Sequence, residues 1–286
     1  MWGMEQMPAA PAHTLNYHFF YWIIKSTRKS SFFYLMPASS SMPVQISHNS
    51  GYIIKMLYEQ PLISGILMRR YKRFLAEVQL VDKTVVLAHC PNSGSMATCC
   101  EPGHSVFLSK GLKKGRKCLY TWELYAAEAG LVCVNTQIPN RVVYEAIVAS
   151  QVPELMGYED VSREVRFGDA RFDLCLQAAD RPPCFVEVKN CTLLHGDLVM
   201  FPDAVTKRGV KHLEALMAAK AMGYRAVMFY FVARPEGKGF GIAGHIDPLY
   251  CATLFRALKS GVEALAYRAE ITTQSVKLSE PVPLML

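Results

Sequence analysis

The sequence predicts a protein of the α+β or α/β class with two domains, a small OB-like β-barrel followed by a mixed-sheet domain. Its 286 residues, 51% of them hydrophobic, suffice for one large or two ordinary cores. Short extended runs separated by turn residues occupy residues 62–139, a pattern typical of a small barrel. Helical and extended patterns then alternate to the end of the chain, which indicates a sheet covered by helices.

Residues 1–55 differ from the rest of the chain. They mix aromatic residues with Ser-rich and Pro-containing stretches and show no stable period. We therefore expect them to be poorly ordered, and we treat Met56 as an alternative start of the protein. The longest apolar stretch here, at residues 18–24, is followed by Lys25 and is shorter than the roughly 20 residues of a membrane helix. No membrane span is expected.

The barrel is predicted over residues 56–138. Extended runs are expected at residues 65–80, 84–90, 105–108 and 130–136. Turn residues between these runs, at 91–94 and 101–103, separate the strands. An OB-type barrel with these features is a fold that often binds nucleic acids.

The mixed-sheet domain is predicted over residues 139–286. Asn140 is a suitable N-cap for a helix at 141–149, and a β-hairpin follows the loop around Pro153 and Gly157. The later elements are a helix at 206–222 that ends at Gly223, a strand at 226–232, a helix at 248–259 and a strand at 262–267. The segment 237–241 is glycine-rich and is predicted to be a mobile loop.

The strongest chemical signal lies in the predicted hairpin. Along residues 171–177 the strand period of two places Asp173 and Cys175 on one face and Phe172, Leu174 and Leu176 on the other. Along residues 185–189 the same period places Glu187 and Lys189 together. A loop at residues 178–182 would pair Gln177 with Pro183, Leu174 with Val186, and Asp173 with Glu187. The two carboxylates would then lie within roughly 5 Å of each other at Cβ.

Two opposed carboxylates repel unless a cation lies between them. A divalent ion, Mg²⁺ or Mn²⁺, would remove the conflict, with Asp173, Glu187, the Val188 carbonyl and a phosphate oxygen among its ligands. Lys189 would orient or deprotonate a water, or offset charge on the phosphate. Glu145, on the preceding helix, is a further candidate metal ligand. The alternative is a solvated cross-strand charge network without chemistry.

Three basic clusters are candidate DNA contacts. Arg69, Arg70, Tyr71, Lys72 and Arg73 interleave cations with aromatics, which suits phosphate contact and base stacking. The alternative is an edge strand protected by charge. Lys113, Lys114 and Arg116 belong to a basic loop, for which a flexible phosphate clamp and a solvated loop are both open. Lys207, Arg208 and Lys211 begin the long helix, where they could hold a phosphate or form its solvent face.

Composition sets broad limits on the partner and compartment. The formal charge of +7 and the pI of about 8.9 are compatible with an anionic partner. The nine cysteines have no C-x-x-C pair or regular spacing, so reduced thiols in a cytoplasmic protein are expected. Association with the nucleoid would follow from DNA binding. A carbohydrate-binding module has little support in the barrel sequence.

The chain from Met56 onward, 231 residues, resembles the sugar fermentation stimulation protein A (SfsA) family, and residues 173–189 are similar to the PD-(D/E)XK nuclease signature. The motifs that carry the resemblance are RYKRFLA (70–76), HCPNSG (89–94), TWEL (121–124), VNT (134–136), FVEVK (185–189), FPDAVT (201–206), RG (208–209) and KHL (211–213). The resemblance implies an N-terminal OB-like domain and a PD-(D/E)XK nuclease-like C-terminal domain.

By position, Asp173, Glu187 and Lys189 match the nuclease motif, and Glu145 matches its helix acid loosely. Asn190 and Cys191 replace an expected Ser-Val pair. Lys207 stands where some relatives have Glu, and the loss of this possible acidic group slightly favours binding over catalysis. The resemblance implies DNA binding with little sequence preference and a role in sugar (maltose) metabolism. Two functions remain open: a DNA-binding protein with a Mg²⁺-dependent phosphodiesterase centre, and a non-enzymatic DNA-binding regulator with a vestigial nuclease site.

Overall fold

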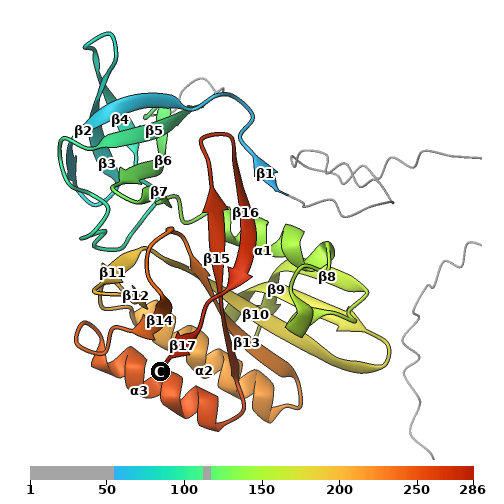
Figure 1. Ribbon diagram of the computed structural model, residues 1–286. Coiled ribbons are helices and arrows are strands. Elements are labelled where there is room, and N and C mark those ends of the chain that lie inside the picture. Colours follow the sequence, from blue (N-terminus) through green and yellow to red (C-terminus); the bar gives the residue numbers. More distant parts are fainter. Residues whose placement is uncertain (1–54, 112–116) are drawn as a thin grey trace, which may run out of the picture. The chain divides into compact units, whose positions relative to one another are not determined.

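The computed structural model describes residues 55–111 and 117–286 (Figure 1). The expectation for residues 1–55 therefore lies outside the described residues, apart from residue 55. The predicted DNA contacts of Lys113, Lys114 and Arg116 also lie outside them. Within the described residues no helix has the length and apolar character required to cross a bilayer. All nine cysteines fall in this part of the chain, and all are free thiols.

The first domain is a sheet in the order β4-β3-β2-β5-β6-β7 that closes because β4 also pairs with β6. The closing pair is parallel and joins Ala88 to Tyr120 and His89 to Thr121. The strands are β2 (Ile63–Tyr71), β3 (Leu75–Leu80), β4 (Val85–His89), β5 (Ser105–Lys110), β6 (Tyr120–Ala127) and β7 (Gly130–Cys133). Strands β2 to β6 form a closed five-stranded barrel, which confirms the predicted OB-like barrel.

The interior of the barrel is solid. Leu67, Val78, Leu108 and Trp122 have no exposed surface and pack together in one cluster. A barrel of this size is filled by its own side chains, so a partner must bind to its outer surface or loops.

The segment predicted as one extended run at residues 65–80 is two strands. Strands β2 and β3 are antiparallel neighbours joined by a turn at residues 72–74, in which Lys72 and Arg73 have φ values of 48° and 63°. Strand β2 lies between β3 and β5, but β5 pairs only with residues 63–66, whereas Arg69 and Arg70 pair with β3 alone. The interpretation of these basic residues as a charged sheet edge therefore stays a prediction.

Strand β6 was not predicted. Its four central residues, 122–125, are all buried, so the alternation of polar and apolar residues is lost. Trp122 and Tyr125 face the barrel core, whereas Leu124 packs into the main core of the second domain. A strand covered on both faces carries no period of two to identify it.

The second domain is built on a sheet in the order β1-β16-β15-β13-β10-β9-β8. The pairs β10–β13 and β13–β15 are parallel and the others antiparallel, which confirms a mixed sheet. Its strands are β1 (Met56–Leu57), β8 (Asp160–Phe167), β9 (Ala170–Ala178), β10 (Arg181–Cys191), β13 (Arg225–Val232), β15 (Glu263–Ile271) and β16 (Ser275–Pro281).

The first residues of the predicted barrel segment belong to this second sheet. Strand β1 pairs antiparallel with β16, Met56 opposite Val276 and Leu57 opposite Ser275. The Met56 side chain is only 4% exposed and packs in the core of the second domain. The assignment of residues 56 and 57 to the barrel is therefore corrected, because burial of Met56 fixes them to the C-terminal sheet.

A second, smaller sheet has the order β11-β12-β14-β17. Its strands are β11 (Leu193–His195), β12 (Leu198–Phe201), β14 (Gly239–Ile242) and β17 (Leu284–Met285). The glycine-rich segment at 237–241 is thus mostly a strand, and the prediction of a mobile loop is wrong. A Cβ on Gly239 would lie 3.0 Å from Met285 and 3.2 Å from Leu198, so the glycine permits a close approach of neighbouring strands.

Helices cover both faces of the large sheet (Figure 1). Helix α1 (Ile138–Val148) packs on one face, and α2 (Lys207–Ala221) and α3 (Pro248–Lys259) pack on the other, with a 3-10 helix, η1 (Pro153–Leu155), after α1. The Thr206 hydroxyl caps α2 by accepting from the Gly209 amide at 3.0 Å, and Asp247 caps α3 through the Tyr250 amide at 2.9 Å. These positions agree with the predicted helices at 206–222 and 248–259.

Helix α1 begins earlier than predicted. It starts at Ile138 with Pro139 in the first turn, and its N-cap residue, Gln137, makes no side-chain capping bond. Pro at this position is favoured because its ring fixes φ and it lacks an amide that would be unpaired there. Asn140 lies inside the helix, so its prediction as the N-cap is wrong, and its side chain is available for another contact.

Arg70 holds the part of the β4–β5 loop that contacts the second domain. Its guanidinium donates to the carbonyls of Asn92, Gly94 and Ser95 at 2.8–3.0 Å, and its Nε donates to Arg73. On the other side of this loop, the Asp203 carboxylate accepts from the Met96 amide at 3.0 Å.

Gly94 is required at the centre of this arrangement. A Cβ there would lie 2.3 Å from both carboxylate oxygens of Asp203, closer than any real contact. The loop is therefore held between a cation of the barrel and an acid of the second domain.

Replacing Arg70 by Ala is expected to lower the free energy of unfolding by about 2–3 kcal/mol, because several carbonyls lose a charged donor. Arg69→Ala serves as the matched control. Its guanidinium forms an exposed ion pair with Glu77, so its loss should change stability little. Urea denaturation of both variants measures the difference. Equal destabilisation by the two substitutions would contradict the role of Arg70.

Candidate metal and phosphodiester site

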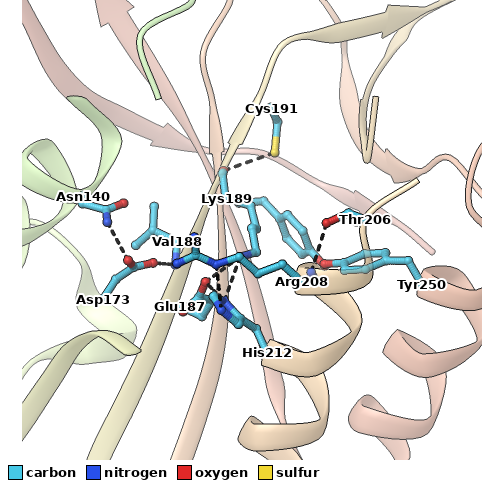
Figure 2. Close-up of polar contacts among 12 residues, drawn as sticks. Asn140, Asp173, Glu187, Val188, Lys189, Cys191, Thr206, Arg208, His212 and Tyr250 are labelled. Atoms are coloured by element: carbon cyan, nitrogen blue, oxygen red, sulfur yellow. Dashed lines mark hydrogen bonds and ion pairs between the residues drawn. The ribbon is translucent and has the colours of Figure 1, made fainter. Parts of the chain in front are cut away.

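The site lies where strands β9 and β10 separate. The antiparallel pairing reaches Leu174 opposite Val186, as predicted, and Asp173 comes next on β9. The Asp173 Oδ2 accepts from the Val188 amide at 2.7 Å, and its Oδ1 accepts from the Asn140 amide group at 2.6 Å (Figure 2). The carboxylate thus takes the place of a strand carbonyl and lies against the backbone that carries Glu187.

The turn of this hairpin is tighter than predicted. Ala178 pairs with Arg181, and the register shifts between Arg181 and Cys184, so the predicted loop at 178–182 and the pairing of Gln177 with Pro183 are wrong. Residues 182 and 183 are both proline and cannot donate to the ladder, which accounts for an irregularity at this position. Because the shift occurs near the turn, Leu174 still faces Val186 as predicted, and the pairing ends before Asp173 and Glu187.

The alternation of faces also breaks at Asp173. Leu174 and Leu176 pack with α1, as the period of two requires. Phe172, however, packs in the opposite cluster with Cys175 and Phe185, so its predicted face is wrong. The break coincides with the residue whose side chain, rather than its backbone, bonds to the neighbouring strand.

Glu187 is the most deeply buried acid of the site, with 2% of its surface exposed. Lys189, two residues further along β10, donates from Nζ to its Oε1 at 2.5 Å, as the strand period predicts. His212 of α2 bonds to the same oxygen through Nδ1. The other oxygen, Oε2, is buried without a hydrogen-bond partner among the described residues.

The contact of His212 with Arg208 indicates which ring nitrogen carries the proton. Arg208 Nε donates to His212 Nε2 at 3.3 Å, and an arginine has only donors. Nε2 therefore supplies the lone pair and Nδ1 carries the proton that is donated to Glu187. This chain of contacts connects the exposed start of α2 to the buried carboxylate (Figure 2).

The two carboxyl groups differ in acidity. Burial, and then the charge of Glu187, raise the pKa of Asp173 to about 6, against the bonds from the Val188 amide and Asn140. Burial also opposes ionisation of Glu187, but Lys189 and His212 outweigh it and hold the pKa of Glu187 below its ordinary value. One acid is thus ionised at neutral pH, and the other titrates close to it.

Glu145 is buried on α1 but is engaged elsewhere. Its Oε1 accepts from Arg141 Nε at 2.7 Å, and its Oε2 has no partner among the described residues. In residues 55–111 and 117–286, no three or more His, Cys, Asp or Glu side chains are grouped to hold a metal ion. Glu187 and Lys189 are thus in contact, as the strand period predicts, whereas the predicted pairing of Asp173 with Glu187 is not found among the described residues, where Asp173 bonds to the Val188 amide and to Asn140. Glu145 is not added as a third ligand.

Sequence reasoning missed two members of the site. His212 was named only within the KHL motif at 211–213, and Asn140 was assigned to a helix cap. The available signal for His212 was its spacing of four from Arg208 on a helix that faces β10. No signal in the sequence pairs Asn140 with Asp173, because 33 residues separate them and the contact depends on the docking of α1.

The basic residues of the barrel have separate roles. Arg69 pairs with Glu77 and lies over the Tyr71 ring, 5.0 Å from its centroid, and Arg70 is occupied by loop carbonyls. Lys72 and Arg73 are exposed at the β2–β3 turn, and neither forms an ion pair within the described part of the chain. Phe74, 44% exposed, stacks on His89 beside them.

The basic residues of α2 also differ from one another in their contacts. Lys207, Arg208 and Lys211 are all exposed in the first two turns of the helix. Arg208 reaches the site through His212, whereas Lys207 makes no ion pair in the part of the chain that the structure describes.

Comparisons with known proteins agree with this two-part architecture. Residues 68–134 match the family described as the SfsA N-terminal OB domain, and residues 137–275 match the sugar fermentation stimulation protein RE domain. These matches cover the barrel and the domain that carries Asp173 and Glu187.

The alignments with two curated relatives span nearly the whole length of each relative. A sugar fermentation stimulation protein homolog of Geobacter sulfurreducens is 50% identical over 231 residues, which is 80% of this chain and 99% of the relative. A homolog of Geobacter metallireducens is 50% identical over 228 residues, 79% of this chain and 98% of the relative. The solved structure of SfsA from Pyrococcus furiosus in complex with Ca²⁺ has a TM-score of 0.74 and 25% identity, covering 82% of this chain and 100% of its own. The chain belongs to the sugar fermentation stimulation protein (SfsA) family.

Proposed function

We propose that this protein binds DNA with little sequence preference and hydrolyses phosphodiester bonds with a divalent cation at Asp173, Glu187 and Lys189. The observation that carries the proposal is the meeting of two carboxylates and an ammonium group where two strands separate, with the buried Glu187 Oε2 left without a partner among the described residues. A buried carboxylate oxygen without a donor is destabilising on its own, and a cation would satisfy it.

The residues present fit a hard divalent ion, Mg²⁺ or Mn²⁺. Glu187 Oε2 and the outer lone pairs of Asp173 are the oxygen ligands that such ions prefer. The related Pyrococcus furiosus protein was solved with Ca²⁺, an ion of the same ligand preference. When bound, the ion would polarise a phosphate oxygen and lower the pKa of a coordinated water.

The side chains of the protein would prepare the site for this ion. Asn140 and the Val188 amide fix the direction of the Asp173 carboxylate, and His212 fixes Glu187. Lys189 lies 3.1 Å from His212 Nδ1, and its ammonium can offset negative charge that develops on the phosphate. Rigid support of this kind keeps the reacting groups in place without further reorganisation.

DNA would be held at two surfaces that carry uncompensated charge. On the barrel, Lys72 and Arg73 provide phosphate contacts and Phe74 provides an exposed ring for a base. On α2, Lys207 and Lys211 extend the positive charge toward the site. A DNA partner implies the cytoplasm as the compartment, which is consistent with the free cysteines.

The second candidate is a non-enzymatic DNA-binding regulator of sugar (maltose) metabolism. The observation that favours it is the occupation of Glu187 Oε1 by Lys189 and His212 and of Glu145 Oε1 by Arg141. In this arrangement, one oxygen of each acid is occupied by side chains of the protein itself. The two candidates share DNA binding and differ only in turnover.

The purified protein is expected to cut DNA in the presence of Mg²⁺ or Mn²⁺. Asp173→Asn should abolish cleavage and retain DNA binding, because it removes a ligand charge but no phosphate contact. Asp180→Asn, an exposed acid in the turn of the same hairpin, is the matched control and should cut like the wild type. A gel assay with supercoiled plasmid and with oligonucleotides measures both properties. Absence of cleavage with every divalent ion would leave the regulator as the function.

Asp173→Asn should also stabilise the metal-free protein at neutral pH. The folded-state pKa of Asp173 is raised to about 6, so the ionised group destabilises the fold above that pH. Its removal should add at most about 3 kcal/mol at pH 7, and the gain should disappear as the pH falls toward the unfolded-state pKa near 4. Added Mg²⁺ should stabilise only the wild type. Thermal unfolding from pH 4 to 8, with and without the ion, tests this, and a gain independent of pH would refute it.

DNA affinity should fall steeply as salt rises. Lys72→Gln and Arg73→Gln should each weaken binding and reduce the slope of log K against log salt by about one for each lost phosphate contact. Lys83→Gln is the control, because Lys83 is an exposed cation with a φ of 69° in a different barrel turn. Fluorescence anisotropy with labelled DNA gives the slopes. Affinity that does not change with salt would rule out the basic turn as a contact.

A further inference from the structure

A groove lies between helix α2 and the turn that joins β8 to β9. Its volume is about 680 Å³, and His212 is one of its lining residues. A volume between roughly 300 and 1,000 Å³ is typical of sites for small organic ligands. Because His212 also bonds to Glu187, one side chain connects the lining of the groove to the candidate metal site.

The polar wall of the groove suits an anion. Arg171, Arg208 and Lys211 line it, opposed by the carboxylates of Asp169 and Glu214. Arg171 is paired with Glu164 at 2.8 Å. Within the described residues Lys211 has no ion-pair partner, and Arg208 uses only its Nε, on His212. The two terminal nitrogens of Arg208 are therefore available to a phosphate, which a guanidinium binds with two parallel hydrogen bonds.

The other wall of the groove is apolar and rigid. Phe167 packs against Phe172, Phe185 and Tyr224, with ring centroids 5.6, 5.1 and 6.2 Å away. This packing fixes the ring, so a ligand that stacks on it pays little conformational entropy. Across the groove, α2 presents the small side chains of Ala215 and Ala218. A planar base can lie between an aromatic ring and such small residues.

We propose that this groove binds one nucleotide unit of a DNA strand next to the phosphodiester that is cut, with Arg208 and Lys211 on its phosphate and Phe167 beside its base. The inference rests on the proposed function, since it assigns the groove to the same substrate. Bases in a duplex are stacked inside it, so a base reaches this groove only when it is unpaired. The substrate class is therefore DNA that is single-stranded or open at this position.

The direct test is titration of the full chain with adenosine 5′-monophosphate by calorimetry, without divalent ion, and with adenosine and inorganic phosphate as separate probes. The nucleotide should bind at least about tenfold tighter than either fragment, because it uses both walls. Arg208→Ala and Lys211→Ala should each weaken it by about tenfold. Glu214→Gln should strengthen it, since a carboxylate no longer faces the phosphate.

Lys259→Ala is the matched control, because Lys259 is an exposed cation at the end of α3 and does not line the groove. It should leave nucleotide affinity unchanged. An equal loss in this variant would show general charge attraction and overturn the site. Nucleotide affinity no greater than that of phosphate would overturn the base contact, and no binding at millimolar concentration would overturn the proposal.

A competition experiment tests the unpaired base. A single-stranded oligonucleotide should displace the nucleotide more strongly than a blunt duplex of the same length, and equal displacement would overturn that part of the inference. These readouts are independent of cleavage. Nucleotide binding without DNA cutting would preserve the groove and remove the nuclease function. Cutting without nucleotide binding would do the reverse.

Discussion

The burial of Glu187 is the constraint on which the rest of the site depends. A carboxylate with 2% exposure in the middle of a sheet must be compensated, because the loss of hydration costs several kcal/mol. Lys189, on the same strand, and His212 supply part of that compensation, and His212 does so only if α2 packs on the face of β10 that carries Glu187. The packing of α2 on β10 and the negative charge of Glu187 therefore depend on each other.

The second carboxylate is held by the opposite face of the sheet. Asn140 belongs to α1, and its amide group bonds to Asp173 at the point where β9 leaves β10. Each acid is thus positioned by a different helix, and the separation of the strands provides the space between them. A cation bound to both acids would link the groups held by α1 to those held by α2, so metal binding would also raise local stability.

The barrel is fixed to the second domain by a few specific contacts, not by a shared sheet. Asp203 accepts from the Met96 amide, and Arg70 holds the same loop from the barrel side. Leu124 of β6 packs in the main core of the second domain. The loop at 91–96 is therefore held from both sides, by Arg70 of the barrel and by Asp203 of the second domain. The proposed contact of two surfaces with DNA would require such rigidity.

The elements with a clear hydrophobic periodicity could be predicted from the sequence alone. The helices at 206–222 and 248–259 were predicted because their caps and apolar stripes are local features. The register that places Leu174 opposite Val186, next to Asp173 and Glu187, was also predicted, because a period of two leaves few alternatives. The prediction failed where burial on both faces erased the period, as in β6, and where a side chain replaced a backbone bond, as at Asp173.

The identity of the side chains that complete the site depends on the tertiary structure. His212 and Asn140 reach it from helices distant in sequence, and no local pattern encodes the docking of those helices. The same is true of Arg70, which the sequence presents as a surface cation and the fold uses to bind carbonyls. Short-range periodicity fixes the direction of a side chain along its own strand or helix. Its partners depend on packing between elements, which the linear pattern does not contain.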